Sequence, residues 1–405
     1  MGFDPTALNH LQDWMHRYVA ERKYPGSALL IRQHGQEAFF HSCGQRDVEN
    51  DLPFERDTVA RIYSMTKPVT SVALMMLAER GLVHLDAPVS DFLPAFQSMQ
   101  ALIPGAESLD QTEDAATPTL HQMLTHTSGL SYPFNPGLLP QEMDRLDLIF
   151  SPDQGPLADR VDLLATLPLA FQPGTRWEYS TGIDVIGRVV EIISGQPLDR
   201  FFADQIFAPL GMTETGFSVP PGAGDRFASL YTPLEGDAMA LNTARQGGET
   251  LRLVDAAGSS PFEAATTFSG GGGLVGTIDD YSRFAEMLRN KGTGNGARLL
   301  GPKTTEYMLC NHLPGDIASM GPQSFAEQPM QGTGFGIGGS VVLNPGRLGA
   351  PSSVGDFGWG GMASTFFWID PVNDLTTVFF TQLSPSSSYP SRAELRSLVL
   401  GGLVG

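Results

Sequence analysis

The two ends of the chain carry mirrored patterns of apolar and polar positions. Residues 6–22 place apolar side chains on one helical face, and Gly26 follows. Two short apolar runs come next, at 27–33 and 36–42, separated by the dipeptide His34-Gly35, which is a two-residue hairpin signal. The pattern therefore predicts an amphipathic helix followed by two antiparallel strands. Its helical face is formed by Leu8, Leu11, Met15, Tyr18 and Val19.

The C-terminal part repeats this arrangement in reverse order. Apolar runs at 364–370 and 375–383 flank the turn "PVND", and 391–403 has helical spacing. Between the two ends strand signals are scarce, whereas proline, glycine and helical spacings dominate. We expect an α/β (α+β) domain with a central antiparallel sheet, built from residues 1–84 and 228–405. Residues 85–227 are then expected to form a mainly helical insertion domain.

Composition narrows the functional classes. The chain has 405 residues, 41% of them hydrophobic, which is enough for a large core, and a net charge of −19. That charge argues against binding nucleic acid or an anionic membrane, because a polyanion would be repelled. No apolar run approaches 18 residues, and no basic segment followed by an apolar one opens the sequence, so we expect no membrane span, no secretory signal and a cytoplasmic location. Cys43 and Cys310 lie far apart, which favours two reduced thiols over a disulfide or a cysteine-rich metal site.

The first candidate for chemistry is the pair Ser64 and Lys67. Residues 65–81 read as a helix that ends at Gly81, and Pro68 is tolerated only in a first turn, which fixes the helix start near Ser64. Positions i and i+3 share a helical face, so Lys67 can reach the serine hydroxyl. Taken alone, an N-capping serine and a surface lysine explain the same spacing.

Two later segments supply further candidates. Tyr179 precedes a predicted helix that ends at Gly195, so its hydroxyl can face a cleft from the entering loop. Asp184, at the start of that helix, either orients groups near Tyr179 or compensates for the helix dipole. The turn 359–361 leads directly into a strand, and its glycines would let a ligand approach backbone N–H groups that could bind an oxyanion.

The segments "SMTK", "YST" and "WGGM" resemble, in order and spacing, the three motifs of family VIII carboxylesterases. These enzymes are related to class C β-lactamases and D-alanyl-D-alanine carboxypeptidases. The phrases "LTHTSGL", "FQPGTRWEYS", "PLGMTET" and "SGGGGLVGTIDDYSRFAEML" are also typical of the family, so the resemblance covers most of the chain. It implies a β-lactamase/transpeptidase-like fold, with an antiparallel sheet flanked by helices, an all-helical domain and the active site between them.

The resemblance also implies roles for individual residues. Ser64 would be the nucleophile with Lys67 beside it, and Tyr179 the base. The oxyanion hole would be formed by the backbone N–H groups of Ser64 and Met362. The remaining substrate contacts would come from Trp359, Gly360, Gly361 and Thr181.

A tyrosine can act as a base only if its pKa, normally near 10, is lowered. A lysine at about 4 Å contributes about 4 kcal/mol at an effective dielectric near 20, which would lower the pKa of Tyr179 by about three units. Two groups coupled this strongly share their titration, so either Tyr179 or Lys67 can formally take the serine proton.

Two departures from the β-lactamase motifs predict a preference for neutral substrates. Thr181 stands where those enzymes carry an asparagine, which removes an amide contact. Trp359 stands where they carry a lysine or histidine, so a cation suited to a substrate carboxylate is replaced by an apolar ring.

Other catalytic arrangements fit the sequence less well. GxSxG is absent, which argues against an α/β-hydrolase nucleophile elbow. His126 is interpreted as a structural hydrogen-bonding residue rather than a base. His121 and His126 lack the HExxH pattern of a zinc site, and no metal or cofactor is expected.

The sequence thus predicts a serine carboxylesterase that hydrolyses small neutral esters with short acyl chains through an acyl-enzyme. Alternatives within the enzyme class are β-lactamase or D-alanyl-D-alanine carboxypeptidase-like amide hydrolysis and acyl transfer to an acceptor other than water. A penicillin-binding-like protein that kept the fold and lost the chemistry is the alternative from another class. The expected partner is a small ester, and the oligomeric state is not predicted.

Overall fold

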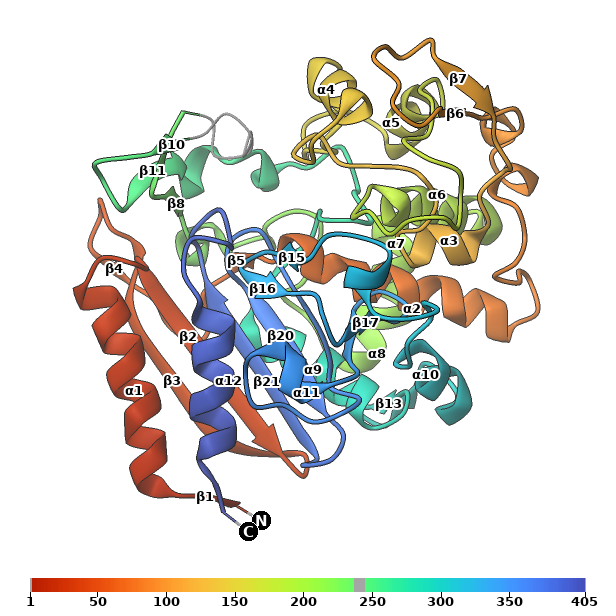
Figure 1. Cartoon of the computed structure of the whole chain (residues 1–405). Helices are drawn as coiled ribbons and strands as arrows, with labels where there is room; N and C mark the ends of the chain where they lie inside the picture. The colour runs from red at the N-terminus through yellow and green to blue at the C-terminus, as the bar shows by residue number, and fades with distance from the viewer. Residues whose placement is uncertain (1, 237–244, 405) are drawn as a thin grey trace.

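An eight-stranded antiparallel sheet, in the order β17-β18-β19-β20-β21-β2-β3-β4, combines strands from both ends of the chain. The computed structural model describes residues 2–236 and 245–404. Figure 1 shows the red N-terminal strands beside the blue C-terminal ones. The strands are β2 (Gly26–Gln33), β3 (Gln36–Asp47), β4 (Leu52–Pro53), β17 (Thr333–Phe335), β18 (Ser340–Val342), β19 (Phe357–Gly360), β20 (Phe366–Asp370) and β21 (Leu375–Thr381). The predicted antiparallel sheet is therefore confirmed.

The predicted hairpin joins β2 to β3, with Gln33 opposite Gln36. His34 and Gly35 both adopt positive φ, 51° and 75°, which is the backbone conformation of a tight two-residue hairpin turn. On its other side β2 pairs with β21, from Ser27 opposite Thr381 to Gln33 opposite Leu375. The first and the last long strands of the described chain are thus direct neighbours.

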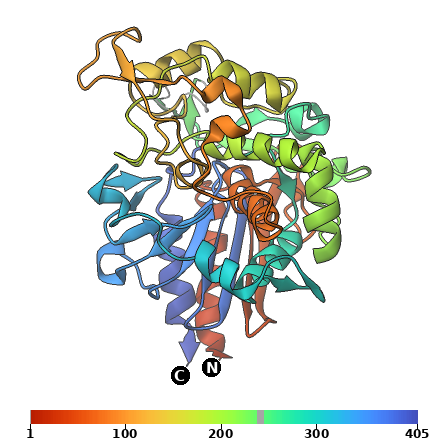
Figure 2. The same cartoon turned by 90° about the vertical axis from the view of Figure 1, so that its right-hand side faces the viewer.

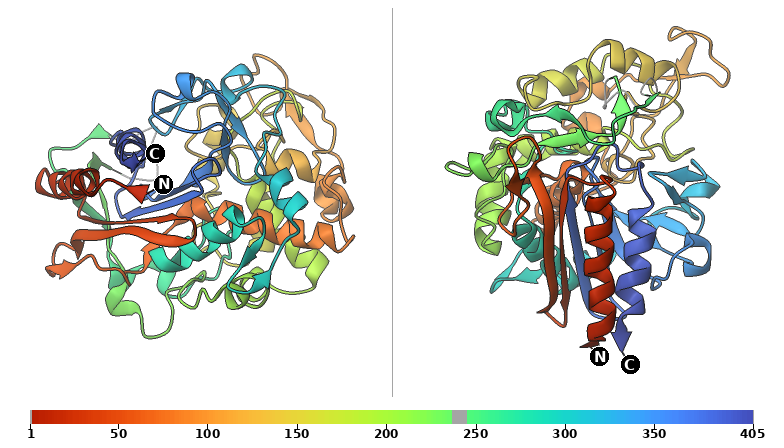
Figure 3. Two further views of the ribbon diagram at one scale, coloured as in Figure 1. Left: turned by 90° about the horizontal axis from the view of Figure 1, so that it is seen from below. Right: turned by 90° about the vertical axis from the view of Figure 1, so that its left-hand side faces the viewer.

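Helices cover both faces of the sheet. On one face α1 (Pro5–Ala20) and α12 (Ser391–Gly401) lie side by side, as Figure 3 shows. Leu29 and Ile31 of β2 pack with these helices, whereas the alternate residues Ala28 and Leu30 belong to the core on the opposite face. That second core includes α2 (Thr66–Glu79), α9 (Ile278–Arg289) and α10 (Pro302–Met308).

A largely helical region lies beside the sheet, in yellow and light green in Figures 1 and 2. Its helices are α3 (Leu120–Leu124), α4 (Leu138–Arg145), α5 (Leu157–Leu164), α6 (Gly182–Ser194), α7 (Leu198–Phe202) and α8 (Ala208–Leu210), with the small hairpin β6 (Gln100–Leu102) and β7 (Thr112–Asp114). Helix α6 packs closely on α3. A Cβ at Gly182 would lie only 2.6 Å from the carbonyl oxygen of Met123, so the absence of a side chain there permits the contact. We retain residues 85–227 as the proposed extent of this domain.

Shorter elements complete the described part of the chain. Strands β1 (Gly2–Phe3) and β22 (Leu403–Val404) pair with each other, so the two ends lie together (Figure 2). No helix in the described ranges is long and apolar enough to cross a membrane. The remaining strands are β5 (Ala60–Arg61), β8 (Leu230–Thr232), β9 (Leu234–Glu235), β10 (Arg245–Gln246), β11 (Arg252–Asp255), β12 (Val275–Gly276), β13 (Thr293–Gly294), β14 (Ala297–Arg298), β15 (Ser324–Phe325) and β16 (Gln328–Pro329). The remaining helical turns are η2 (Val89–Asp91), η3 (Pro94–Phe96), η4 (Ala203–Phe207), η5 (Gly224–Arg226), η6 (Ala257–Ser259), η7 (Pro261–Glu263), η8 (Ile317–Ser319) and α11 (Pro345–Leu348).

Candidate active site

Ser64 lies in the short turn η1 (Tyr63–Met65), which runs directly into α2. Pro68 is the third residue of α2, within the first turn, where its missing N–H breaks no helical hydrogen bond. The helix ends at Glu79, and Gly81 follows with φ 71°. The sequence therefore located the helix correctly, and Ser64 stands at its N-terminal end, where the helix dipole favours developing negative charge.

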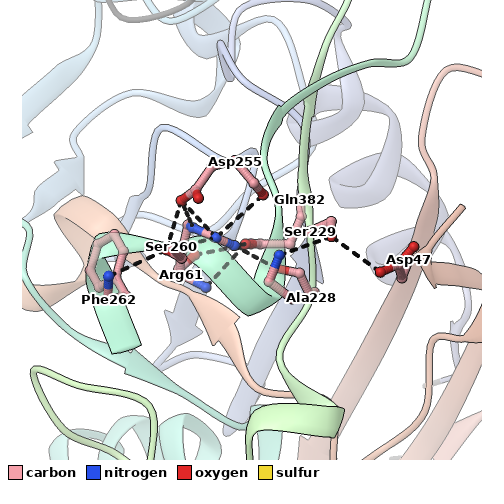
Figure 4. Close-up of polar contacts among 9 residues, drawn as sticks. Asp47, Arg61, Ala228, Ser229, Asp255, Ser260, Phe262 and Gln382 are labelled. Carbon is pink, nitrogen blue, oxygen red and sulfur yellow. Dashed lines mark hydrogen bonds and ion pairs between the residues drawn. The ribbon is translucent and has the colours of Figure 1, made fainter. Parts of the chain in front are cut away.

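The turn that carries Ser64 is anchored by Arg61, whose side chain is completely buried (Figure 4). The guanidinium donates to Asp255 Oδ2 at 2.7 and 2.9 Å, to Ser260 Oγ at 3.1 Å and to the carbonyl of Ala228. The backbone of Arg61 also exchanges two hydrogen bonds with the side chain of Gln382, at 3.1 and 3.0 Å. Four distant segments are thereby fixed to the strand that precedes the serine.

Lys67 is fully buried and contacts three polar groups at the site. Its Nζ lies 3.1 Å from Ser64 Oγ, 3.0 Å from Tyr132 OH and 2.7 Å from the carbonyl oxygen of Gly271. Burial disfavours the charged ammonium and lowers the pKa of Lys67 to about 7, although the negative charge of Asp184 acts in the opposite direction. Near neutral pH a substantial fraction of Lys67 therefore has a free lone pair within reach of the serine proton.

Asp184 lies behind this cluster, in the first turn of α6, and is also fully buried. Its Oδ1 accepts hydrogen bonds from Ser269 Oγ at 2.5 Å and from Gly271 N at 2.9 Å. Burial raises the pKa of Asp184, while the nearby Lys67 lowers it. Asp184 therefore orients the glycine-rich segment that presents the Gly271 carbonyl to Lys67. Of the two roles considered for Asp184, these contacts favour orientation of site groups over compensation of the helix dipole.

Tyr179 is buried against the site rather than exposed, with 5% of its surface accessible. Burial raises its pKa above the usual value of 10, while hydrogen bonds with Ser64 and Trp359 act in the lowering direction. The expectation that Lys67 lowers the pKa of Tyr179 is therefore wrong. The physical reason is desolvation, because burial disfavours the charged phenolate. Lys67 Nζ donates to Tyr132 OH and lies over the face of the Tyr179 ring, 4.6 Å from its centroid.

The end of β19 provides the opposite wall of the site. Gly361 N donates to Thr365 O at 2.7 Å, and a Cβ at Gly361 would lie only 2.3 Å from the carbonyl oxygen of Ile62. Glycine is therefore needed for this strand end to approach the serine turn. Within the described ranges the N–H of the next residue, Met362, donates to no protein acceptor, so it is free to bind a substrate oxygen.

These residues open onto a cavity of about 620 Å³. Ser64, Tyr179, Trp359, Gly360, Gly361 and Met362 all line it, together with several aromatic side chains. Its charged lining residues, among those the structure describes, are Asp255, Arg392 and Arg396. Each forms an ion pair: Asp255 with Arg61, Arg392 with Glu327 at 2.6 Å, and Arg396 with Asp356 at 2.7 Å.

Two sequence candidates do not face the cavity. Thr181 is completely buried, and its hydroxyl donates to the carbonyl of Ser131 at 3.3 Å, because the first turn of α6 directs it into the helical region. The predicted substrate contact of Thr181 is not supported. His126 is buried behind Tyr179, where its Nδ1 accepts from Ser180 N at 3.2 Å and burial lowers its pKa well below 6.5. This agrees with its interpretation as a structural residue.

Sequence reasoning missed Tyr132 and the role of Gly271. Tyr132 lies two residues after the family phrase that ends at Leu130, and its hydroxyl lies between Lys67 and Asp184, 3.5 Å from Asp184 Oδ2. Gly271 lies within the glycine-rich phrase, where a Cβ would meet Asp184 Oδ2 at 2.3 Å. The phrases indicated the correct segments, but nothing in them identified these contacts.

Comparison with known proteins finds relatives over most of the chain. The beta-lactamase family model matches residues 11–401. Protein Rv1367c of Mycobacterium tuberculosis (strain H37Rv) is 34% identical, with 92% of this chain and 91% of the relative covered. Esterase EstB of Burkholderia gladioli is 31% identical, with 98% of each chain covered. Among solved structures, EstCE1, described as a hydrolase with promiscuous acyltransferase activity, has a TM-score of 0.78 at 28% identity and covers 97% of this chain and 98% of its own.

Proposed function

We propose that this chain, which belongs to the beta-lactamase family and is a serine hydrolase, acts as a carboxylesterase on small neutral esters. The observation that carries the proposal is the 3.1 Å contact between Lys67 Nζ and Ser64 Oγ at the wall of an apolar cavity. Without a base in hydrogen-bond reach, a serine hydroxyl is a weak nucleophile.

In the proposed acylation, neutral Lys67 takes the proton of Ser64 while the serine oxygen attacks the ester carbonyl carbon. The oxyanion that forms would be bound by the N–H groups of Ser64 and Met362, each donor contributing roughly 10² to 10³ in rate. The carbon–oxygen bond to the alcohol then breaks, and the proton held by Lys67 passes to the leaving alkoxide.

Tyr179 has a different role in this proposal from the base that the family resemblance implied. With its pKa raised by burial, it stays protonated and, through its hydrogen bond with Ser64, suits a proton relay between Ser64 and the leaving group. Water then attacks the acyl-enzyme, and Ser64 recovers its proton.

The preference for neutral substrates rests on the charges of the cavity. All three charged lining residues of the described chain already have a partner of opposite sign, so a substrate carboxylate would have to displace an existing ion pair. Displacing Glu327 or Asp356 would leave that buried carboxylate without its arginine, which is unfavourable.

Acyl transfer is the second candidate, because EstCE1 is described as having it and because the cavity is large enough to hold an acceptor alcohol. An alcohol would then replace water in the second half-reaction. Ester product formed from an added alcohol, measured beside free acid, distinguishes transfer from hydrolysis.

The test of the main proposal is a comparison of kcat/KM for p-nitrophenyl esters of increasing acyl length and for a chromogenic cephalosporin. Short neutral esters should exceed the cephalosporin at least roughly tenfold, the cost of an unmet charge-assisted hydrogen bond. Ser64→Ala should retain less than roughly a hundredth of the esterase activity with unchanged circular dichroism. If a fluorophosphonate probe failed to label Ser64 in the wild type, the chain would be a binding protein instead.

A further inference from the structure

A second group of reactive side chains lies on the face of the sheet opposite Ser64. His41 and Cys43 are two residues apart on β3, so both point to the same face, and that face is covered by α1, which carries His16. Their cross-strand partners are Leu29 and Ser27, and Leu29 belongs to the core beneath α1. Figure 3 shows α1 lying along the sheet on this side.

The donor atoms of the three residues converge. His16 Nε2 and His41 Nε2 are 3.1 Å apart, and the Cys43 sulfur lies within 4.8 Å of both. In a tetrahedral zinc site, bonds of about 2.0 Å to nitrogen and 2.3 Å to sulfur place ligand atoms roughly 3.3 to 3.6 Å from one another. The three donor atoms are therefore close to this spacing, and the exposed His16 side chain has room to turn.

We propose that His16, His41 and Cys43 form a binding site for a thiophilic divalent cation such as Zn²⁺, with the fourth position open to water. Two imidazoles and one thiolate are ligands that favour Zn²⁺ and copper, whereas Mg²⁺ and Ca²⁺ require oxygen ligands.

The protonation states of the ligands are compatible with this use. Burial, followed by the neighbouring His16, lowers the pKa of His41, which favours the neutral imidazole that binds metal. Burial raises the pKa of the Cys43 thiol, so the incoming cation must displace that proton, as Zn²⁺ does for coordinating thiols.

The site connects α1 to β3 and lies across the sheet from the catalytic cluster. A bound cation would consequently stabilise the attachment of the N-terminal helix, because a ligand that binds only the folded chain raises its stability. It would supply no group to the ester reaction.

The test is titration of the full-length, reduced protein with Zn²⁺ by calorimetry and with Co²⁺ by absorption spectroscopy. We expect one Zn²⁺ per chain, an increase in Tm on binding and, with Co²⁺, a thiolate charge-transfer band together with the d–d bands of a tetrahedral site. Cys43→Ser should abolish the charge-transfer band, and His16→Gln should weaken Zn²⁺ binding at least roughly tenfold.

Cys310→Ser is the matched control. Cys310 is exposed and its sulfur lies 3.7 Å from His312 Nε2, so it is a second thiol next to an imidazole, but outside the proposed site. This variant should bind Zn²⁺ and Co²⁺ like the wild type. Absence of binding to the wild type, or loss of the cobalt bands in Cys310→Ser with their retention in Cys43→Ser, would overturn the proposal. Thermal unfolding of each metal-free variant shows that it is folded before titration.

Discussion

The indole N–H of Trp359 donates a hydrogen bond of 3.2 Å to the phenolic oxygen of Tyr179. The sequence predicted that Trp359 contacts the substrate and replaces a cation by an apolar ring. This hydrogen bond connects Trp359 to the tyrosine that also bonds Ser64. Trp359 therefore affects the proton relay as well as the shape of the cavity.

Trp359→Phe should lower kcat for p-nitrophenyl butyrate roughly three- to tenfold. The phenyl ring keeps most of the apolar surface but removes a donor, and a net hydrogen bond is worth about 0.5 to 1.5 kcal/mol. Trp177→Phe is the control: Trp177 stacks near the same tyrosine, at 6.4 Å between ring centroids, but its Nε1 has no hydrogen-bond partner. An equal fall in kcat in Trp359→Phe and Trp177→Phe would show that the loss comes from packing and not from the hydrogen bond.

Ester hydrolysis should depend on pH with an acidic limb near pH 7. Lys67 can accept the serine proton only when it is neutral, and its pKa is lowered to about 7, so activity falls about tenfold per unit below that value and levels off above it. The rate of acid release from ethyl butyrate in a pH-stat measures this without a leaving group that itself titrates.

The same measurement needs a background in which Glu327 cannot titrate, because burial raises the pKa of Glu327 to about 7 as well. Glu327→Gln supplies it. Adding Tyr179→Phe to Glu327→Gln should lower the maximal rate reached at high pH and leave the acidic limb of the pH profile near pH 7. Disappearance of the limb in the tyrosine variant would instead make Tyr179 the titrating base.

Glu327→Gln should also make the cavity accept anions. Arg392 contacts both carboxylate oxygens of Glu327, at 2.6 and 2.8 Å, and lines the cavity next to Gly360. Once its partner is neutral, a substrate carboxylate can take its place, which is worth about 1.5 to 3 kcal/mol, or roughly ten- to a hundredfold. The measured quantity is kcat/KM for a succinate half-ester relative to the neutral diester, well above pH 7, where Glu327 of the wild type is charged.

Glu142→Gln controls for net charge in this experiment, because it removes the same charge from an exposed pair with Arg145 on α4. Its ratio of half-ester to diester should equal that of the wild type. An unchanged ratio in Glu327→Gln would show that Arg392 does not select against anions.

Gly361→Ala should damage both stability and catalysis. The new Cβ would approach the Ile62 carbonyl to 2.3 Å, so the end of β19 must move away from the serine turn. We expect roughly 1 to 3 kcal/mol of destabilisation from the overpacked contact and a fall in kcat on the order of 10², the effect of losing one oxyanion donor. Gly258→Ala, where a Cβ meets nothing within 4 Å, should change neither Tm nor kcat. Wild-type kcat in Gly361→Ala would argue against Met362 as a donor.

The sequence predicted those parts of the molecule whose cause is local. Pro68 and Gly81 mark the ends of the nucleophile helix, and the hairpin at His34-Gly35 requires two positive φ angles that its residues tolerate. These features depend on neighbours a few residues away, so one chain read alone is enough to locate them.

The details of the site could not be predicted, because they depend on segments far apart in the sequence. Lys67 contacts Gly271, which is 204 residues away, and burial in this shared environment lowers the pKa of Lys67 and raises that of Tyr179. A pairwise estimate between lysine and tyrosine gave the opposite direction for the tyrosine, since it contained no desolvation. The predicted substrate contact of Thr181 was wrong for a similar reason. Its position in the motif was clear, but the direction of its side chain depends on how α6 packs.

The pairing of β2 with β21 has a consequence for how the chain is made. Residues 26–33 leave the ribosome hundreds of residues before their partners at 375–381 are synthesised. Until then β2 has β3 on one side and an open edge on the other, and such edges promote association with other chains. Closing a sheet across nearly the full length of the polypeptide is also slow. Biogenesis of this protein is therefore expected to depend on chaperones that shield the nascent N-terminal hairpin until the C-terminal strands arrive.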